Sequence, residues 1–473
     1  MSGESAETKS GSWRELLGGR HAAVSAVLAG GVLLEASNVY LTTSLLPTIV
    51  ADIGGEQYYA WTMTSFLVAS VITSMLVSRL LTTRGAVTSY VLAFLLFTAG
   101  TVVCAVSPGM TTFLIGRAVQ GLGGGLMAGL GYALIQRALP ERLWARGAAL
   151  VSAMWGVGNV LGPAVGGLFG QFGAWRLAFF VLAAVALALV VLAVRAIPRT
   201  STGPSASPIP FGSLALLTAS VAAVSVASVL SGVATAVAIA VGVVLVVWFL
   251  RHERTGRASV LPKVAFDGGS SLRWVYVTVV ALAFGLGTEA FIPLFGQEIG
   301  ALPPLVAGFL GAALSLGWSL AQIFSANATA PRAVRTLVVA GPALLAAGLV
   351  GYGALQQTMP AGVIVAAWFV VLFVAGSGIG TAFPHLTVAA LGATDDEEEG
   401  AKAAAGINTV LIIANAFSAA AAGVLVNLGA PDVVASAHYL LFGFAIAAVL
   451  GVFPALAAMR RSPKRHQASS GAD

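Results

Sequence analysis

The sequence has few charged residues for its length. Aspartate, glutamate, lysine and arginine make up only 9% of its 473 residues, whereas 58% are hydrophobic. A soluble domain carries roughly a quarter of its residues as charges, because they cover its water-facing surface. Most of the surface of this chain must therefore face lipid, which excludes an ordinary soluble fold.

Residue types that usually perform chemistry or bind metals are also scarce. The single cysteine, Cys104, lies inside an apolar run, where it can form neither a disulfide framework nor a CxxC metal pair. The sequence contains no HExxH motif, and no Ser/His/Asp set or Cys/His ligand cluster is apparent. We therefore expect no enzyme activity, no metal and no cofactor, and we interpret Cys104 as a packing residue.

Apolar runs of about 20 residues, long enough for a helix to cross a bilayer, recur along the whole chain. They predict an all-α polytopic membrane protein of about fourteen transmembrane helices. The expected spans are 22–50, 58–80, 86–106, 111–137, 146–169, 175–195, 211–230, 232–250, 273–296, 303–326, 333–356, 361–391, 403–428 and 433–459. Only Leu230, Ser231 and Gly232 separate the seventh span from the eighth, so a re-entrant hairpin is an alternative there.

The basic residues indicate how the chain is oriented. With fourteen spans and a cytoplasmic N-terminus, 22 of the 24 lysines and arginines fall in cytoplasmic segments. The other two are Arg176, at an outer helix end, and Arg117, inside the fourth span. Short cytoplasmic loops of membrane proteins carry such an excess of positive charge. The net charge of +6 is therefore a topology signal rather than a nucleic-acid-binding surface, and both termini are expected in the cytoplasm.

Two segments outside the spans have a distinct composition. Residues 199–211, RTSTGPSASPIPF, are rich in proline and serine and are typical of a flexible linker. Residues 11–19, GSWRELLGG, could form a short helix along the membrane surface. In that arrangement Trp13, Leu16 and Leu17 would dip into the bilayer.

Two pairs of similar segments indicate an internal repeat. LLPTIVADIGG at the end of the first span resembles FIPLFGQEIGA at the end of the ninth, and GLGGG in the fourth span resembles GSGIG in the twelfth. Both pairs place the first six spans over the last six, with spans seven and eight inserted between them. The predicted organisation is a cytoplasmic segment 1–21, an N-terminal six-helix bundle 22–197, a linker with two extra helices and a cytoplasmic loop 198–272, a C-terminal six-helix bundle 273–459 and a cytoplasmic tail 460–473.

Several motifs resemble those of one transporter family. LLPTIVADIGG ends the first span, LIGRAVQGLGGG lies in the fourth, and GVGNVLGPAVGG in the fifth is followed by AWRLAFF. In this combination the chain resembles the major facilitator superfamily, and specifically its fourteen-helix drug:proton antiporters (EmrB/QacA-like). The resemblance implies two six-helix bundles with two inserted helices in the cell membrane. It also implies multidrug efflux driven by protons, a function associated with antibiotic resistance.

Ionisable side chains inside a span cost several kcal/mol unless they are paired or wetted, so each is a functional candidate. Four stand well inside: Glu35, Arg117, Glu289 and His385. Glu35, halfway along the first span, is the predicted proton-coupling acid, since a buried carboxylic acid can exchange a proton as access alternates. The alternative is a structural partner for Arg117, whose counterpart in the family is implicated in proton transfer.

Glu289 could bind a cationic substrate or a second proton, or could line a wet vestibule. His385 could titrate near physiological pH, and its alternative is a neutral packing histidine. Polar and aromatic residues near these groups complete the predicted substrate site: Asn38, Gln120, Tyr40 and Trp155. For any one of the aromatic residues, core packing or an interfacial belt is the alternative.

The fifth span carries the predicted conformational motif. Its glycines are spaced so that one helix face is smooth and a neighbouring helix can pack closely, and a proline there kinks or softens the helix. The motif residues are Gly158, Gly162, Pro163, Gly166 and Gly167. The alternative is ordinary close packing without a gating role.

The chain departs from the family pattern in two places. The acid of the family's first helix would fall at Asn38, whereas here the acid is Glu35, one turn toward the cytoplasm. The usual loop motif GxxxDRxGRR between spans two and three is SRLLTTRGAV here, with Thr82 in place of its aspartate. That loop normally helps to latch the cytoplasmic gate, so we expect this gate to close through other contacts, or coupling to differ.

The leading hypothesis is therefore a secondary transporter that exports amphipathic or lipophilic small molecules, with cationic ones among the candidates, in exchange for protons. Alternatives are an exporter of an endogenous lipid, siderophore or antibiotic, and a membrane scaffold or sensor that transports nothing. The intramembrane acids and the lack of a sizeable soluble domain favour transport. The expected partners are the substrate, protons and the lipid bilayer, and no sequence feature indicates an oligomeric state.

Overall fold

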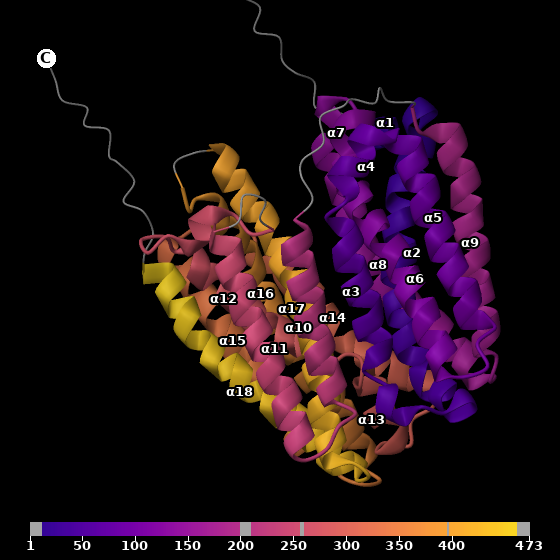
Figure 1. Cartoon of the computed structure of the whole chain (residues 1–473), viewed down its shortest axis with the longest axis vertical. Coiled ribbons are helices and arrows are strands. Elements are labelled where there is room, and N and C mark those ends of the chain that lie inside the picture. The colour runs from indigo at the N-terminus through magenta and orange to yellow at the C-terminus, as the bar shows by residue number, and fades with distance from the viewer. Residues whose placement is uncertain (1–11, 199–209, 256–259, 395–396, 461–473) are drawn as a thin grey trace, which may run out of the picture.

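A computed structural model of the chain describes residues 12–198, 210–255, 260–394 and 397–460. These residues form helices and turns, and no strand occurs among them (Figure 1). The longer helices are α2 (Gly19–Ile53), α3 (Trp61–Ser74), α5 (Gly85–Ala105), α6 (Met110–Ala133), α8 (Trp144–Gln171), α9 (Trp175–Ala196), α10 (Phe211–Ala227), α11 (Val233–Thr255), α12 (Leu272–Leu286), α14 (Pro304–Ser325), α15 (Pro331–Ala354), α16 (Gly362–Leu391), α17 (Glu397–Gly429) and α18 (Val433–Arg460). The short ones are α1 (Trp13–Leu16), α4 (Val77–Thr83), α7 (Ile135–Ala138), α13 (Ile292–Glu298) and the 3-10 turns η1 (Glu56–Tyr58), η2 (Glu141–Leu143) and η3 (Lys263–Phe266).

Each predicted span coincides with one of these helices or with a broken pair of them. In the described part of the chain, 11 helices are long and apolar enough to cross a membrane, and 12 if α3 and α4 form one bent span. Helices α10 and α12 are apolar but shorter. The all-helical polytopic fold is thus confirmed, while the number of fourteen spans stays a prediction.

Two predicted spans are broken rather than continuous. The second consists of α3 and α4, which meet at an angle of 45°. Just before this bend the Ser74 hydroxyl donates to the carbonyl of Val71, a type of bond that bends helices. The ninth consists of α12 and α13, separated by residues 287–291. Pro293 lacks the N–H that would bond to the carbonyl of Glu289, so a continuous helix would lose that bond.

The glycine-rich segments place their helices in equivalent positions. A methyl group on Gly121 or Gly125 of α6 would lie 2.2 or 2.1 Å from a backbone oxygen of α3, and one on Gly123 would lie 2.4 Å from the backbone of α5. The glycines at 376–380 bring α16 equally close to α14 and α15. Spans two, three and four therefore pack as spans ten, eleven and twelve do, in the pattern that a repeat predicts.

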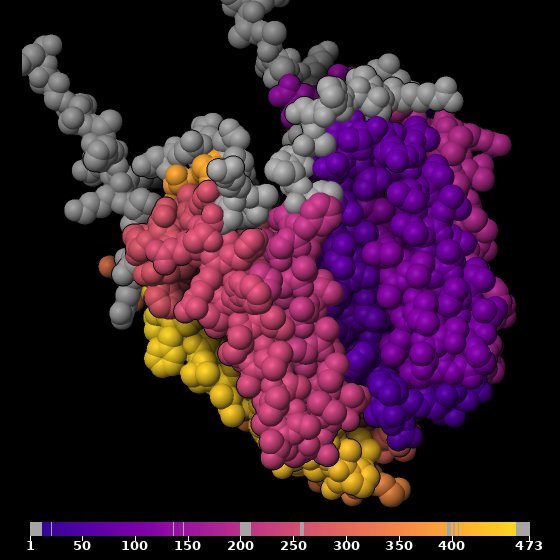
Figure 2. All heavy atoms as spheres, viewed as in Figure 1, coloured from indigo at the N-terminus to yellow at the C-terminus, as the bar shows by residue number. Residues whose placement is uncertain are grey.

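The two halves of the chain lie side by side and diverge toward the end of the molecule that carries α1 and α7 (Figure 1). They approach each other at the opposite end, where α13 lies. We call these the α1 end and the α13 end. The inserted helices α10 and α11 pack against each other and lie along the junction of the halves (Figure 2).

The N-terminal helix α1 differs from its prediction. Leu16 is fully buried in the protein, and its carbonyl accepts a hydrogen bond from Ser25 at 3.0 Å, so it does not dip into the bilayer. Trp13 and Leu17 are exposed. Glu15 pairs with Arg142 at 2.5 Å, and this docks α1 on the loop before α8.

Three predicted segments fall largely outside the described residues: the N-terminal segment up to residue 11, the linker at 199–209 and the tail after residue 460. The predicted domain boundaries around them stay predictions.

Candidate functional site

A buried polar network joins α2 and α6 in the N-terminal half. The Arg117 guanidinium, fully buried, donates to the carbonyl of Thr62 at 3.1 Å and to the side-chain oxygen of Gln120. Gln120 in turn donates to Asn38 at 2.9 Å and to Thr101 at 2.8 Å. The guanidinium also lies 3.5 Å from the Thr42 hydroxyl, so none of these bonds is to a carboxylate. The structure thus brings together three predicted site residues, Arg117, Gln120 and Asn38.

The ring of Phe66 contacts Arg117, and its tip and Glu35 both lie close to Gly124. The guanidinium carbon of Arg117 lies 4.4 Å from the centre of this ring, a cation–π contact. A methyl group on Gly124 would lie 2.8 Å from the tip of the same ring and 3.6 Å from an oxygen of Glu35. Arg117 and Glu35 both lie in the described part of the chain, and they form no ion pair in this structure. The structural pairing considered as an alternative is therefore absent from this conformation.

Glu35 sits in the middle of α2 with little access to solvent. Its side chain is 4% exposed, and its buried Oε2 has no hydrogen-bond partner in the described structure. An isolated carboxylate at this depth is costly as an ion, and such groups in membrane proteins mark proton or ion pathways. The geometry therefore suits a group that binds and releases a proton rather than one that stabilises the fold.

Glu289 belongs to a second cluster, at the contact between the two halves. It lies in the break between α12 and α13 and accepts a hydrogen bond from Ser315 of α14. The Ser315 oxygen is 3.1 Å from the hydroxyl of Tyr40 on α2. Because Ser315 uses its single proton on the carboxylate, Tyr40 must be the donor in that pair. A directed chain of hydrogen bonds thus runs from the N-terminal half to an acid in the C-terminal half.

The space beside this chain is too small for a substrate. The cavity there measures about 10 Å³, room for roughly one water molecule, whereas ligand-binding pockets measure roughly 300–1,000 Å³. Its lining residues are Tyr40, Thr43, Ser44, Pro163, Glu289, Pro293, Gly308, Gly311 and Ala312. Thr43 and Glu289, which correspond to each other in the predicted repeat, line the same cavity. In this conformation the cluster is a closed contact rather than an open binding site.

The predicted smooth face of α8 is packed against α2. A methyl group on Gly158 or Gly162 would lie 2.5 Å from the Cβ of Ala36 or Tyr40, and Gly166 meets the same helix. Gly167 points to α14 instead, where a methyl would lie 2.5 Å from the Cα of Leu305. Helix α8 runs unbroken through Pro163, which lines the Glu289 cavity. The gating role of this motif stays a prediction.

Trp155 and His385 are not joined to either acid. Trp155 is 36% exposed on α8, one turn before the packed glycines. His385 lies 3.0 Å from the hydroxyl oxygen of Ser325, which itself donates to the carbonyl of Thr381. This is the geometry of a packing histidine between α14 and α16, the alternative weighed for His385 from the sequence.

Sequence reasoning missed two residues that organise these clusters, Phe66 and Ser315. A phenylalanine or a serine in an apolar helix carries no signal that separates a site residue from its neighbours. Ser315 stands out only when α14 is placed against the break in the ninth span, and Phe66 only when α3 is placed against α6.

Comparison with known proteins decides the family. Residues 28–400 match the sequence model of the Major Facilitator Superfamily. The chain belongs to the Major Facilitator Superfamily. It is accordingly a multi-pass membrane transporter for a small-molecule substrate, and not an enzyme. Membership in the fourteen-helix antiporter subfamily stays a prediction.

Individual relatives of this superfamily member align with most of the chain. A "probable multidrug-efflux transporter" of Mycobacterium tuberculosis is 43% identical over 463 residues, which are 96% of this chain and 98% of the relative. A multidrug transporter protein of Bacillus subtilis is 23% identical over 368 residues, 75% of this chain and 66% of the relative.

Solved structures show the same fold at low sequence identity. The crystal structure of a D-xylose–proton symporter matches with a TM-score of 0.66 at 16% identity, over 94% of this chain and 98% of the symporter. A peptide transporter of the POT family matches with a TM-score of 0.64 at 17% identity, over 92% of this chain and 96% of the other. The superfamily fold predicted from the motifs is therefore confirmed.

Proposed function

We propose that this protein exports amphipathic or lipophilic small molecules across the cell membrane in exchange for protons, by alternating access. The names of its relatives support efflux of several drugs. A proton gradient supplies the energy and no cofactor takes part. In the proposed orientation both termini are cytoplasmic, so the α1 end faces the cytoplasm and the α13 end faces outward.

The observation that carries proton coupling is the isolated carboxyl group of Glu35. It is buried halfway along α2, and its Oε2 has no partner in the described structure. A transporter can use such a group because the uncharged acid tolerates a sealed site, while the ion requires water or a cation. Each change of access then exposes Glu35 to one side, where it gains or loses its proton.

Arg117 has a supporting role in this proposal. Its bonds to Thr62 and Gln120 hold it in the bundle without a carboxylate, and its cation lies over Phe66. A positive charge fixed beside the pathway favours release of the proton from Glu35 once water enters, since it stabilises the carboxylate that remains.

Glu289 acts at the outward side in this proposal. The chain from Tyr40 through Ser315 to Glu289 joins the halves only while the α13 end is closed. Opening outward separates α2 from α14 and leaves the carboxylate of Glu289 free to meet a cationic group of the substrate. Trp155, half-exposed on α8, offers an aromatic surface nearer the cytoplasmic side, where a lipophilic substrate could stack.

Transport in proteoliposomes tests the mechanism. Purified protein would receive an imposed pH gradient and a panel of lipophilic cations, with uptake measured for the parent, Glu35→Gln and Glu56→Gln. Glu56 is an exposed acid at the α13 end and serves as the matched control. We expect gradient-driven transport in the parent and the control, and at least a tenfold loss in Glu35→Gln. Full activity of Glu35→Gln, or transport indifferent to the gradient, would overturn the proposal.

A further inference from the structure

The inserted helices have no counterpart in the six-helix repeat, so their contacts indicate what they add. Helix α10 packs against α3 of the N-terminal half, against α17 of the C-terminal half and against its partner α11. Figure 2 shows the atoms of this inserted pair directly beside those of the N-terminal half. The pair therefore covers the seam between α3 and α17 on one side of the molecule.

The end of α10 is bonded to both halves. The indole N–H of Trp61, at the start of α3, donates to the Ser225 carbonyl at 3.0 Å and to the Ser228 hydroxyl at 3.1 Å. From the other half, the side-chain amide of Asn427 on α17 donates to the Ser228 carbonyl at 2.5 Å. Ser228 is 3% exposed. One buried residue of the inserted pair thus accepts hydrogen bonds from the two halves at once.

The three helices meet at close range beside these bonds. A methyl group on Gly423 of α17 would lie 2.6 Å from the Cβ of Ala60, just before α3, and 3.2 Å from the Cβ of Ser228. Only a glycine leaves room for this approach. The junction at the α13 end is therefore both polar and tightly packed.

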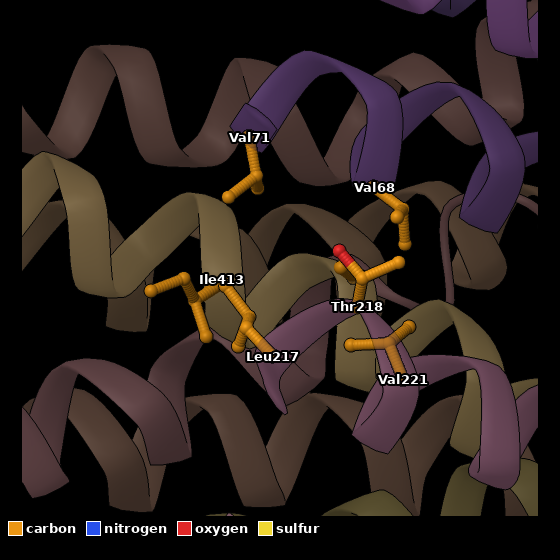
Figure 3. Close-up of a pocket in the computed structure, with 7 residues that line it drawn as sticks. Val68, Val71, Leu217, Thr218, Val221 and Ile413 are labelled. Atoms are coloured by element: carbon orange, nitrogen blue, oxygen red, sulfur yellow. The ribbon is translucent and has the colours of Figure 1, made fainter. Parts of the chain in front are cut away.

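Midway along α10 the contact has a different character. A narrow crevice of about 10 Å³, room for roughly one water molecule, lies between the three helices there (Figure 3). Its lining residues are Val68, Val71, Leu217, Thr218, Val221, Ile413 and Ala416. The apolar side chains packed there are held by non-directional dispersion contacts that tolerate sliding, whereas the hydrogen bonds at Ser228 are directional.

We propose that α10 and α11 form a strap across the α3–α17 seam, attached to both halves at Ser228, which holds the α13 end closed. Rocking of the halves can displace α3 and α17 at the crevice without breaking a hydrogen bond. Opening the α13 end pulls α3 away from α17, so the strap must release either Trp61 or Asn427. Each bond therefore stabilises the conformation with a closed α13 end relative to the conformation in which that end is open.

Distance measurements between spin labels on the full-length protein test the strap. One label pair, at Glu56→Cys and Leu428→Cys, reports the α13 end, and a second, at Thr83→Cys and Leu391→Cys, reports the α1 end. All four positions are exposed, whereas the native Cys104 is buried and escapes labelling. The test variants are Trp61→Phe, Asn427→Ala and Ser228→Ala. The matched control is Trp248→Phe, a 58% exposed tryptophan of α11.

We expect Trp61→Phe and Asn427→Ala each to raise the population open at the α13 end roughly threefold, the effect of one typical hydrogen bond between membrane helices. The distance at the α1 end should shorten in the same fraction of molecules. Ser228→Ala, which removes only the hydroxyl acceptor, should give a smaller shift in the same direction. Distance distributions identical to those of Trp248→Phe in all three variants would overturn the strap. This readout does not depend on protons, so it stands or falls separately from the role of Glu35.

Discussion

The packing of α8 on α2 yields a prediction that can be worked out from two glycines of one helix. A methyl group on Gly162 would lie 2.5 Å from the Cβ of Tyr40 and 2.9 Å from the carbonyl oxygen of Ser37. Carbon atoms in contact normally sit about 3.5–4.0 Å apart, so Gly162→Ala must push the two helices apart by about 1 Å. A methyl on Gly156, less than two turns earlier, would meet no atom within 4 Å.

The two substitutions differ in free energy by the cost of this overlap alone. Alanine stabilises a helix by roughly 0.5–1 kcal/mol over glycine, and both variants gain this amount. Overpacking a tight contact costs roughly 1–3 kcal/mol, and only Gly162→Ala bears it. We therefore expect Gly156→Ala to be as stable as the parent or slightly more so, and Gly162→Ala to fall below Gly156→Ala by about 1–3 kcal/mol.

Thermal unfolding of the purified variants in detergent, followed by tryptophan fluorescence, measures the difference. We expect the midpoint of Gly162→Ala to lie below that of the parent, and the midpoint of Gly156→Ala to lie at or above it. Equal unfolding midpoints for Gly162→Ala and Gly156→Ala would refute the close packing of α2 on α8. Transport by the same variants tests the gating role. If the contact between α2 and α8 must re-form in every cycle, Gly162→Ala should obstruct it and lower the transport rate, whereas Gly156→Ala should not.

Two further predictions concern the ends of the molecule. Tyr40→Phe removes the hydroxyl that donates to Ser315, so we expect the population open at the α13 end to rise roughly threefold in the spin-label assay. The control is Tyr90→Phe, whose buried hydroxyl has no partner in the described structure. An equal rise in this control would contradict the prediction. The hydrogen bond from Arg142 lowers the pKa of Glu15 from its ordinary value of 4.5. A carboxyl group whose pKa is lowered by folding stabilises the folded form at a pH above its ordinary pKa. This stabilisation is lost as the pH falls through the lowered pKa. The protection factors of the amides at residues 13–17, which compare each exchange rate with the intrinsic rate at the same pH, should therefore be higher at pH 7 than below pH 4.5, and Glu15→Gln should lower them at pH 7.

The helical architecture could be predicted because hydropathy alone specifies where a chain can cross a bilayer. Every predicted span contains helix, and the glycine segments at 121–125 and 376–380 do occupy equivalent positions. The breaks at residues 75–76 and 287–291 could not be predicted from hydropathy, because the first is apolar throughout and the second has only Thr288 and Glu289 as polar residues within a long apolar run. Pro293 is part of the repeat motif, but whether it breaks the helix depends on the groups that surround the carbonyl it leaves without a backbone partner. Only the packed structure shows these groups.

The structure joins some of the predicted site residues, but the sequence does not show how they are connected. Arg117, Gln120 and Asn38 stand out as polar groups in apolar helices, and the structure joins them. The separation of Glu35 from Arg117 depends on the rotation of α3, which places Phe66 beside both. Helix rotation follows from many small packing contacts and leaves no motif in the sequence.

The unusual loop between α4 and α5 indicates that the two ends of the molecule differ in the bonds that can close them. Thr82, which replaces the loop aspartate of the resembling family, bonds only to carbonyls of its own helix, those of Ser78 and Arg79. The described part of this loop thus lacks the family's latching acid at position 82. Toward the α13 end, by contrast, the halves are joined by the Tyr40–Ser315–Glu289 chain and by the strap at Ser228. Bonds that exist in one conformation only shift the equilibrium toward it, so this transporter should rest with its α13 end closed. Substrate binding and the proton gradient together must then supply the free energy that opens that end.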